Sequence, residues 1–284
     1  MRPRASVLAW PYLVGLALLI GLPALAALTL AFTRFTGLTS PEAAGLDNFD
    51  RLFADAAFWR ALGNSLVYVA IAVPLRMAAA IGAALLLHGR ARGSGVGRVV
   101  AYGPSVIPDV AWALLWLWLL NPLFGPLALA ASTLGFGSSG ILTDPWATRI
   151  AIAMMGAFQI GEAFVIALAA RRLIPQPLYE AASVDGASAW FTVRRVTLPL
   201  MAPAIGLLAL RDVVLSFQLN FVPALIITDG GPRYATTYVP LYLYRTAFRY
   251  FRLGYASAMS VFLFAVTGLV LYVQYRLARR SGLI

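Results

Sequence analysis

Long apolar runs dominate the chain and are separated by short polar segments. A membrane-spanning helix needs about 20 mainly apolar residues, and six stretches of the chain meet that requirement. They are residues 8–32, 65–87, 99–120, 150–170, 198–228 and 255–275. We therefore predict an all-α integral membrane protein with about six transmembrane helices. The fifth run carries Arg211 and Asp212, so we expect this helix to be broken or tilted.

The composition agrees with a membrane protein. Of the 284 residues, 61% are hydrophobic and only 12% are charged, whereas a soluble domain carries roughly 25% charged residues. The net charge of +11 comes from arginines that lie mostly between the apolar runs. They do not form one basic face, so we favour membrane orientation over nucleic-acid binding.

The residue types that are missing exclude several functions. Without cysteine there is no thiolate metal site or cysteine nucleophile, and the single histidine, His88, cannot build a metal site alone. The chain has no lysine, so it has no Gly-Lys-Ser/Thr phosphate-binding loop and cannot be an ATP-hydrolysing subunit. Serines lie without a histidine nearby. We predict no catalytic residues, no metal and no cofactor on this chain.

Orientation follows from the arginines, which concentrate in cytoplasmic segments of membrane proteins. The side that holds both ends of the chain has twelve arginines and two acids in short segments, whereas the other side has eight arginines and six acids. We therefore place both termini in the cytoplasm. The start of the chain, with "ALA" at 24–26, resembles a signal peptide. Because its apolar run continues to Phe32, we interpret it as an uncleaved anchor.

Three polar segments outside the apolar runs have their own predicted structure. Residues 48–61 place Phe49, Leu52, Phe53 and other apolar residues at helical spacing, which indicates an amphipathic helix on the membrane surface. Residues 121–147 are rich in Gly, Pro and Ser and suggest a loop or re-entrant segment. Gly230-Gly231-Pro232 predicts a turn. No internal repeat is evident, so an inverted-repeat carrier gains no support.

A polar stretch, residues 175–199, interrupts the apolar sequence on the cytoplasmic side. Pro175 and Pro177 end the preceding helix, and Pro177 can begin a new one that runs to Val184. Gly186 permits a turn with positive φ, and Ser188 can cap a second short helix. We expect two short helices at an angle that project from the bilayer and pack on a partner.

The same stretch carries a family pattern of Glu-Ala-Ala, three residues, Gly, nine residues, an aliphatic residue, one residue and Leu-Pro. It resembles the coupling loop of the membrane-spanning subunits of bacterial ATP-driven importers, except that Val196 stands where that family prefers Ile. The resemblance implies that this loop docks in a cleft of a cytoplasmic ATPase. The coupling residues would be Glu180, Ala181, Ala182, Asp185, Gly186, Leu198 and Pro199.

A second block narrows the resemblance. Residues 228–264, which begin "TDGGPRYATTYVPLYLY", are similar to the end of the larger, maltose-transporter type of carbohydrate-importer permease, and 48–68 also look like that family. The resemblance implies the type I importer permease fold. Residues 1–64 would form an N-terminal helix with an outer amphipathic segment, and residues 65–284 a core of five transmembrane helices with the coupling loop at 175–199.

Five charged residues lie inside predicted spans, where charges are costly and usually face a cavity or a partner. They either line a polar translocation path or form structural ion pairs with one another. These residues are Arg76, Asp109, Glu162, Arg211 and Asp212.

Sugar sites combine amide or carboxylate groups with aromatic faces, and the outer half of the fifth run offers Gln218, Asn220 and Phe221. Gln159 and Glu162 are further candidates. The amides could instead form interhelical hydrogen bonds.

The resemblance implies a permease subunit of a binding-protein-dependent sugar importer in the bacterial inner membrane. Its partners would be a second permease, a cytoplasmic ABC ATPase dimer that holds ATP and Mg, an extracytoplasmic solute-binding protein, the sugar and the lipid bilayer. One alternative is the same architecture carrying glycerol phosphate esters or polyamines. A second is an ATP-independent secondary carrier or channel, which the coupling loop disfavours, and a third is a membrane-bound enzyme, which lacks catalytic groups here.

Overall fold

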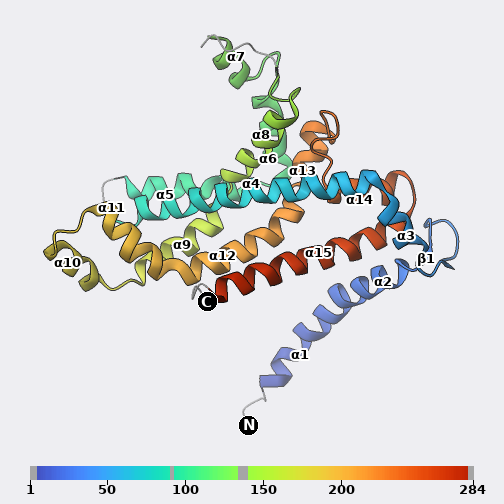
Figure 1. The fold of residues 1–284 in the computed structure, drawn as a ribbon, viewed down its shortest axis with the longest axis horizontal. Coiled ribbons are helices and arrows are strands. Elements are labelled where there is room, and N and C mark those ends of the chain that lie inside the picture. Colours follow the sequence, from blue (N-terminus) through green and yellow to red (C-terminus); the bar gives the residue numbers. More distant parts are fainter. Residues whose placement is uncertain (1–4, 90–92, 134–139, 281–284) are drawn as a thin grey trace. The chain divides into compact units, whose positions relative to one another are not determined.

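The computed structural model describes residues 5–89, 93–133 and 140–280 (Figure 1). Apart from one pair of two-residue strands, the regular structure in these ranges is helical, which confirms the all-α prediction. The chain divides into two compact units, each of which combines distant segments. The first unit contains Met1–Arg60 and Leu241–Gly268, and the second contains Ala61–Pro240 and Leu269–Ile284.

The first unit begins with an apolar helical run of α1 (Ala5–Leu16), a π turn (Ala17–Gly21) and α2 (Leu22–Leu30). No part of the 18-residue apolar window of this run is buried against the rest of the chain, as expected for a helix that lipid surrounds. After α2, β1 (Thr33–Arg34) pairs antiparallel with β2 (Glu42–Ala43). This hairpin leads into α3 (Asp47–Ala54).

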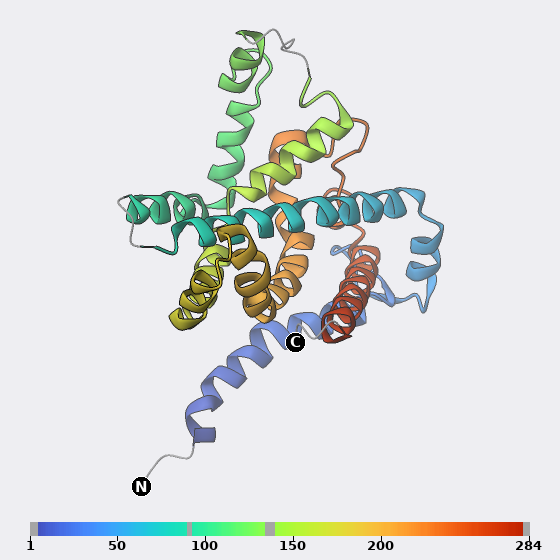
Figure 2. The ribbon, with the colours of Figure 1, turned by 60° about the vertical axis from the view of Figure 1, so that its left-hand side comes forward.

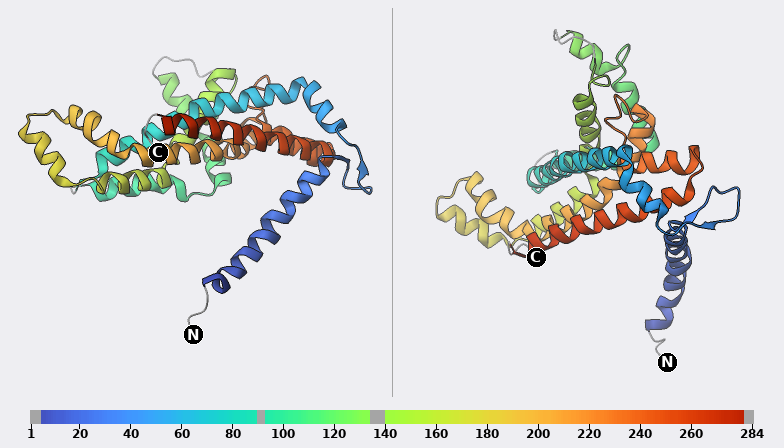
Figure 3. Two further views of the ribbon diagram at one scale, coloured as in Figure 1. Left: turned by 60° about the horizontal axis from the view of Figure 1, so that its bottom comes forward. Right: turned by 45° about the vertical axis from the view of Figure 1, so that its right-hand side comes forward.

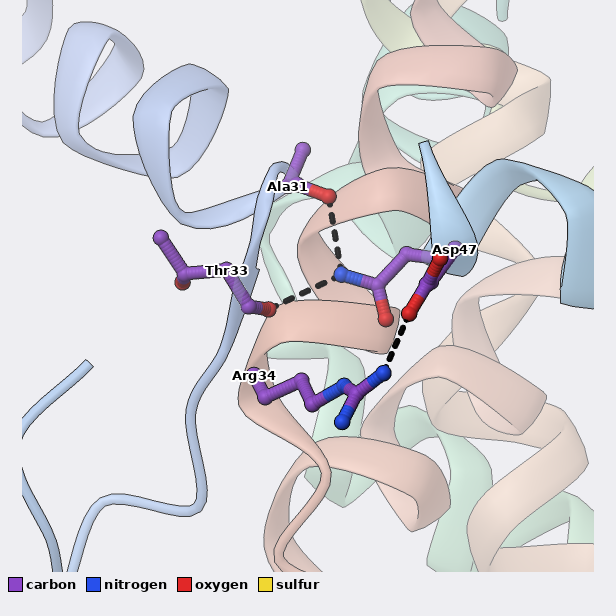
Figure 4. Close-up of polar contacts among 5 residues, drawn as sticks. Ala31, Thr33, Arg34 and Asp47 are labelled. Carbon is purple, nitrogen blue, oxygen red and sulfur yellow. Dashed lines mark hydrogen bonds and ion pairs between the residues drawn. The ribbon is translucent and has the colours of Figure 1, made fainter. Parts of the chain in front are cut away.

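Hydrogen bonds from Asn48 hold the start of α3 against the segment that follows α2. Its Nδ2 donates to the carbonyl oxygens of Ala31 and Thr33, both at 2.9 Å, and Arg34 forms an ion pair with Asp47 beside it (Figure 4). Asn48 is buried, so these bonds satisfy an amide that would otherwise be costly to bury. The backbone of Gly254 lies directly against β1. A Cβ at this position would lie only 2.0 Å from the carbonyl oxygen of Thr33.

The expected single amphipathic helix at 48–61 is wrong, because Asp55 breaks it. α3 ends at Ala54 and α4 (Ala56–Leu87) begins directly after Asp55, which has an extended backbone. The Oδ1 atom of Asp55 accepts hydrogen bonds from the N–H groups of Ala57 and Phe58, at 2.9 and 3.2 Å. A capping carboxylate therefore starts a new helix where the apolar pattern alone continues.

Within the described ranges the structure has four candidate spans, and six if each of two bent helix pairs is counted as one span. Four helical runs are long and apolar enough to cross a membrane: Trp10–Leu30, Ala56–Leu87, Ala189–Thr228 and Leu253–Arg279. The third span consists of α5 (Ser94–Tyr102) with the 3-10 turn Gly103–Val106, and α6 (Asp109–Leu119), at 102° to each other. The fourth consists of α8 (Pro145–Ala157) and α9 (Gly161–Arg172), at 53°.

The two bends pack against each other. In the third span Ile107 precedes Pro108 and is extended, because the proline ring disfavours the helical conformation of the residue before it. In the fourth span the N–H of Gly161 donates to the Oγ of Ser105 at 2.7 Å. A Cβ at Gly161 would lie within 3.0 Å of both Ser105 and Tyr102. The missing side chain therefore lets the two breaks meet.

The fifth span is not broken. Helical structure runs from Ala189 to Thr228 through α11 (Ala189–Thr192), α12 (Leu198–Leu219) and α13 (Phe221–Pro223), with π turns at Val193–Thr197 and Ala224–Thr228. At 40 residues it exceeds what a perpendicular crossing needs, so tilt or protrusion takes up the excess.

Two short helices, α7 and α14, lie between candidate spans. The segment at 121–147, expected to be a loop or re-entrant, contains α7 (Pro126–Thr133) and the start of α8, and its residues 134–139 lie outside the described ranges. α14 (Val239–Tyr244) and the π turn Arg245–Arg249 precede α15 (Leu253–Arg280).

The second unit packs Trp112 and Trp116 of α6 against Ala151 and Met155 of α8, two helices that rise from the same side of α4 in Figure 2.

Candidate transport site and coupling hairpin

The polar stretch at 175–199 forms a helical hairpin at one end of the second unit, where α10 (Gln176–Val184) and α11 extend beyond α9 and α12 (Figures 1 and 3). Pro175 stands before the first helical residue, and Pro177 lies in the first turn. Ser188 caps α11 by accepting a hydrogen bond from the N–H of Phe191 at 3.3 Å. Both predicted short helices are thus present.

Gly186 ends α10 in a specific motif. It has a φ of +72°, its N–H donates to the carbonyl of Ser183, and the N–H of Ala187 donates to the carbonyl of Ala182, at 3.1 and 2.9 Å. This pair of bonds, from the first two residues after the cap to the last turn, is a Schellman motif, which needs a left-handed residue at this position. A Cβ on Gly186 would meet nothing within 4 Å. The glycine is therefore required by its backbone conformation and not by close packing.

Side-chain contacts hold the base of the hairpin together, and most of its predicted coupling residues are exposed. The hydroxyl groups of Tyr179 and Thr197 are 3.1 Å apart, and the guanidinium of Arg171 lies 4.2 Å from the centre of the Tyr179 ring. The predicted coupling residues divide by exposure: Ala182 and Leu198 are half-buried, and the exposed ones are Glu180, Ala181, Asp185, Gly186 and Pro199. The Glu180 carboxylate has no hydrogen bond or ion pair within the described ranges.

Four of the five charged residues in the spans form ion pairs. The Nε atom of Arg76 in α4 lies 3.3 Å from Oδ2 of Asp212 in α12, and both side chains are buried. Arg76 also donates through Nη2 to the Oγ of Ser216 at 2.8 Å. Arg211 pairs with Glu162 of α9, and this pair is more exposed. The structural interpretation of these charges therefore applies at least to the two pairs.

Asp109, the fifth charge, lines a small cavity in the second unit together with Arg76 and Gln159. The cavity has about 20 Å³ of room, enough for about one water molecule. Tyr68, Met155 and Leu219 are among its other lining residues. A positive, a negative and an amide side chain thus meet beside the kinks of the third and fourth spans. In this conformation the space is too small for a sugar.

The predicted sugar-contact residues differ in exposure and in surroundings. Gln218 is exposed, Phe221 is half-buried, and Asn220 is fully buried, although its amide nitrogen and oxygen have no hydrogen-bond partner among the described residues. Gln159 lines the small cavity, whereas Glu162 is held by Arg211. A buried amide without partners is costly, so Asn220 stands apart from the other predicted path residues.

A hydrogen-bonded cluster around Asn64, near the Gly-Gly-Pro turn, was not predicted. Asn64 donates through Nδ2 to the carbonyls of Tyr234 and Thr237, at 2.8 and 3.2 Å. Arg149 of α8 donates to Asn64 Oδ1 at 2.7 Å and to the carbonyl of Ala235 at 3.1 Å. The sequence signal was the Asn64-Ser65 pair at the start of an apolar run, since Ser65 also accepts a bond from the N–H of Val239.

A second unpredicted cluster surrounds Asp55 in the first unit. While its Oδ1 caps α4, its Oδ2 accepts hydrogen bonds from the hydroxyl groups of Tyr242 and Tyr255, each at 2.7 Å. Burial acts to raise the pKa of the Asp55 carboxyl, but the bonds from the two tyrosines and from the N–H groups of Phe58 and Ala57 outweigh it and hold the pKa below its usual value.

Several helical runs that are long and apolar enough to cross a membrane, together with a glycine-bent hairpin between two of them, define a multi-pass membrane protein. Comparison with known proteins identifies the class further. Residues 76–281 match the family described as "Binding-protein-dependent transport system inner membrane component", and the chain belongs to this family.

Individual relatives agree with this family. The chain is 33% identical to the probable ABC transporter permease protein YesP of Bacillus subtilis, across 94% of this chain and 87% of YesP. It is 30% identical to the lactose transport system permease protein LacF of Rhizobium radiobacter, across 83% and 80% of the two chains. Among solved structures, a bacterial alginate ABC transporter in complex with an alginate pentasaccharide-bound periplasmic protein has a chain that matches with a TM-score of 0.85. That match has 23% identity and covers 97% of this chain and 94% of that chain.

Proposed function

We propose that this chain forms half of the translocation path of an ATP-driven, binding-protein-dependent sugar importer. The observation that carries the proposal is the 175–199 hairpin in a chain of this family: its outer face is free, and its second helix continues without a break into the span that carries Gln218 and Asn220. A push on the hairpin would therefore move the path residues directly. Residues 1–64 and 65–284 would act as the anchor segment and the core.

Three protein partners complete the proposed importer: a second permease, a cytoplasmic ABC ATPase dimer and an extracytoplasmic solute-binding protein. The lipid bilayer surrounds the permeases. ATP and Mg would bind to the ATPase, and this chain would bind no cofactor. ATP-driven closure of the ATPase dimer would move α10 and α11. Glu180, Ala181, Ala182, Asp185, Gly186, Leu198 and Pro199 would transmit that motion. The periplasmic protein in the related alginate transporter complex supports the third partner.

For the cargo, we infer a sugar that contacts Gln218, Asn220 and Phe221, with Gln159 and Glu162 as further path residues. The lactose transport system permease among the relatives supports this substrate class. The partnerless Asn220 amide supports a polar ligand, because hydroxyl groups can both donate to and accept from an amide. Glycerol phosphate esters or polyamines are the alternative cargo.

The orientation belongs to the proposal as well. Both termini and the hairpin would face the cytoplasm of a bacterium, and Asp50 and Arg233 would face outward. Single cysteines at Asp50, Arg233 and Arg172 test this with an impermeant maleimide added to intact cells. Labelling of the Arg172 site from outside would refute the orientation.

The test of function is transport by the assembled complex in vesicles. We expect sugar uptake that requires ATP and the binding protein, and we expect Gln218→Ala and Asn220→Ala to weaken uptake while assembly and basal ATP hydrolysis persist. Loss of one ligand hydrogen bond costs about 1 kcal/mol, roughly five-fold in binding. Uptake by this chain alone without ATP would indicate a secondary carrier. Uptake kinetics that neither substitution changes would remove both amides from the path.

A further inference from the structure

The first unit has an open hollow of about 540 Å³ whose residues serve no part of the proposed translocation path. It lies where α3, the π turn Arg245–Arg249 and the start of α15 meet, and it is lined by Arg51, Asp55, Tyr242, Tyr250, Arg252 and Tyr255, among others. Its size falls within the range of small-molecule sites, about 300–1,000 Å³.

The hollow lies at one membrane face. Asp55 directly precedes the span Ala56–Leu87, and Arg252 directly precedes the span Leu253–Arg279. Because Asp55 accepts the hydrogen bond of Tyr255, the starts of these two spans meet at the same face. In the proposed orientation this is the outer face, where the cargo arrives.

Two arginines in the hollow form no ion pair within the described ranges. Arg51 and Arg252 are both exposed, and neither guanidinium has an ion pair or side-chain hydrogen bond with any residue in the described ranges. Arg51 is positioned by the ring of Tyr255, 5.7 Å from its centre. A guanidinium presents paired N–H donors that match the two oxygens of a carboxylate. The hollow therefore presents two sites that recognise an anion.

The acid in the hollow does not compete for these arginines. Both oxygens of Asp55 are occupied, Oδ1 by two backbone N–H groups and Oδ2 by Tyr242 and Tyr255. Two free positive charges thus face one carboxylate that is already hydrogen-bonded. The local balance favours an added negative group.

The tyrosines define the rest of the ligand. Tyr250 is 61% exposed, so its ring offers an aromatic face at the hollow. The hydroxyl groups of Tyr242 and Tyr255 donate to Asp55 and keep their lone pairs as acceptors. Aromatic faces suit the C–H faces of a sugar ring, and hydroxyl acceptors suit its hydroxyl groups.

We propose that this hollow is an outer binding site for a carboxylated sugar, with Arg51 and Arg252 holding the carboxylate and Tyr250 contacting the ring. The inference rests on the proposed function as a sugar importer and names an acidic sugar as a class of cargo that it accepts. The hollow shares no lining residue with the proposed path residues of α12, and it would bind acidic sugar at the outer face.

The test measures binding of D-glucuronate by saturation-transfer NMR to the assembled permease complex in lipid nanodiscs, with D-glucose as the neutral control. We expect glucuronate to bind and glucose to bind at least several-fold more weakly. Arg51→Gln or Arg252→Gln should weaken glucuronate about ten-fold, because each removes charge-assisted hydrogen bonds. Arg51→Lys should recover part of the loss, since it restores charge without the paired donors.

Arg60→Gln is the matched control, because Arg60 is an exposed arginine of the same unit that does not line the hollow. Equal binding of glucose and glucuronate, or equal losses in the Arg60 and Arg252 variants, would overturn the proposal. So would Arg51 and Arg252 variants that weaken only association with the binding protein. Failure of the proposed function would look different: no sugar would be taken up, whatever the binding result.

Discussion

Arg76 and Asp212 face each other across two spans, with 3.3 Å between Nε and Oδ2 and with side-chain exposures of 6% and 8%. Ser216, one turn further along α12, accepts the second bond of Arg76. Arg76 also lines the small cavity that Asp109 and Gln159 share. One buried cation thus joins α4 to α12 and borders a small polar cavity of the second unit.

Removing one member of this pair should be worse than removing both. Arg76→Leu leaves Asp212 buried without its partner, which typically costs about 3–5 kcal/mol. The double variant Arg76→Leu, Asp212→Leu leaves no buried charge and should recover much of that loss. Thermal unfolding of the purified complex measures both, and a double variant less stable than the single one would contradict this account of the pair.

The hydrogen bonds of Asn64 should hold the 229–238 loop in its folded position. Asn64→Ala removes its bonds to Tyr234, Thr237 and Arg149, each worth about 1 kcal/mol. We expect faster trypsin cleavage after the exposed Arg233 in the folded complex. Asn48→Ala is the control, because it removes two comparable bonds in the other unit. Similar cleavage rates in parent and Asn64 variant would show that the loop is held by other contacts.

The Asp55 cluster should make stability depend on pH in the acid range. The folded pKa of Asp55 lies below its unfolded value, so the stabilisation is fully present above the unfolded pKa of about 3.9 and is lost as the pH falls through the folded pKa. Asp55→Asn should be less stable than the parent at neutral pH. The difference should narrow below about pH 4. A difference that stays constant with pH would contradict a carboxylate role.

The Schellman turn of the hairpin should tolerate a side chain but not a stiff one. Nothing lies within 4 Å of a Cβ on Gly186, so the effect of a substitution comes from backbone conformation alone. Asn visits the left-handed region more readily than other residues, whereas the β-branched Val resists it. In reconstituted vesicles Gly186→Val should lose binding-protein-stimulated ATP hydrolysis and uptake together, while Gly186→Asn should keep most of both.

Glu180 gives an independent test of the same hairpin, since its exposed carboxylate has no partner in the described part of the chain. Glu180→Ala should leave insertion and folding intact and reduce stimulated ATP hydrolysis through loss of a charge-assisted bond to the ATPase. Glu180→Gln should lie between the two. If both Glu180 variants and Gly186→Val assemble and transport like the parent, the hairpin is not the coupling element.

Apolar runs and prolines were enough to predict the six spans and the hairpin, because both depend on local composition. Pro175, Gly186 and Ser188 each act on the backbone within a few residues, so their effects could be read from their neighbours. The break at Asp55 could not, because the apolar spacing at 48–61 continues through it. Besides capping α4, the Asp55 carboxylate binds two tyrosines from α14 and α15, which are distant in the sequence.

The candidate path shows the same limit. The sequence indicated which charges and amides lie in the spans but left their partners open. The fold decides that Asp212 pairs with Arg76 and Glu162 with Arg211, and that Asp109 borders a cavity instead. It also separates Gln218 from Asn220, one exposed and one buried. Two positions apart on a helix, such residues point about 200° apart, and neighbours distant in sequence then determine their surroundings.

Two π turns, one before α12 and one after α13, bear on how the chain can change in length. A single inserted residue turns everything after it in an α-helix by about 100°, which would swing Asp212 away from Arg76. A π turn holds an additional residue and can absorb such an insertion locally. Val193–Thr197 and Ala224–Thr228 are therefore the two places where this 40-residue helix can gain or lose one residue. Elsewhere in it, a deletion would rotate one end against the other.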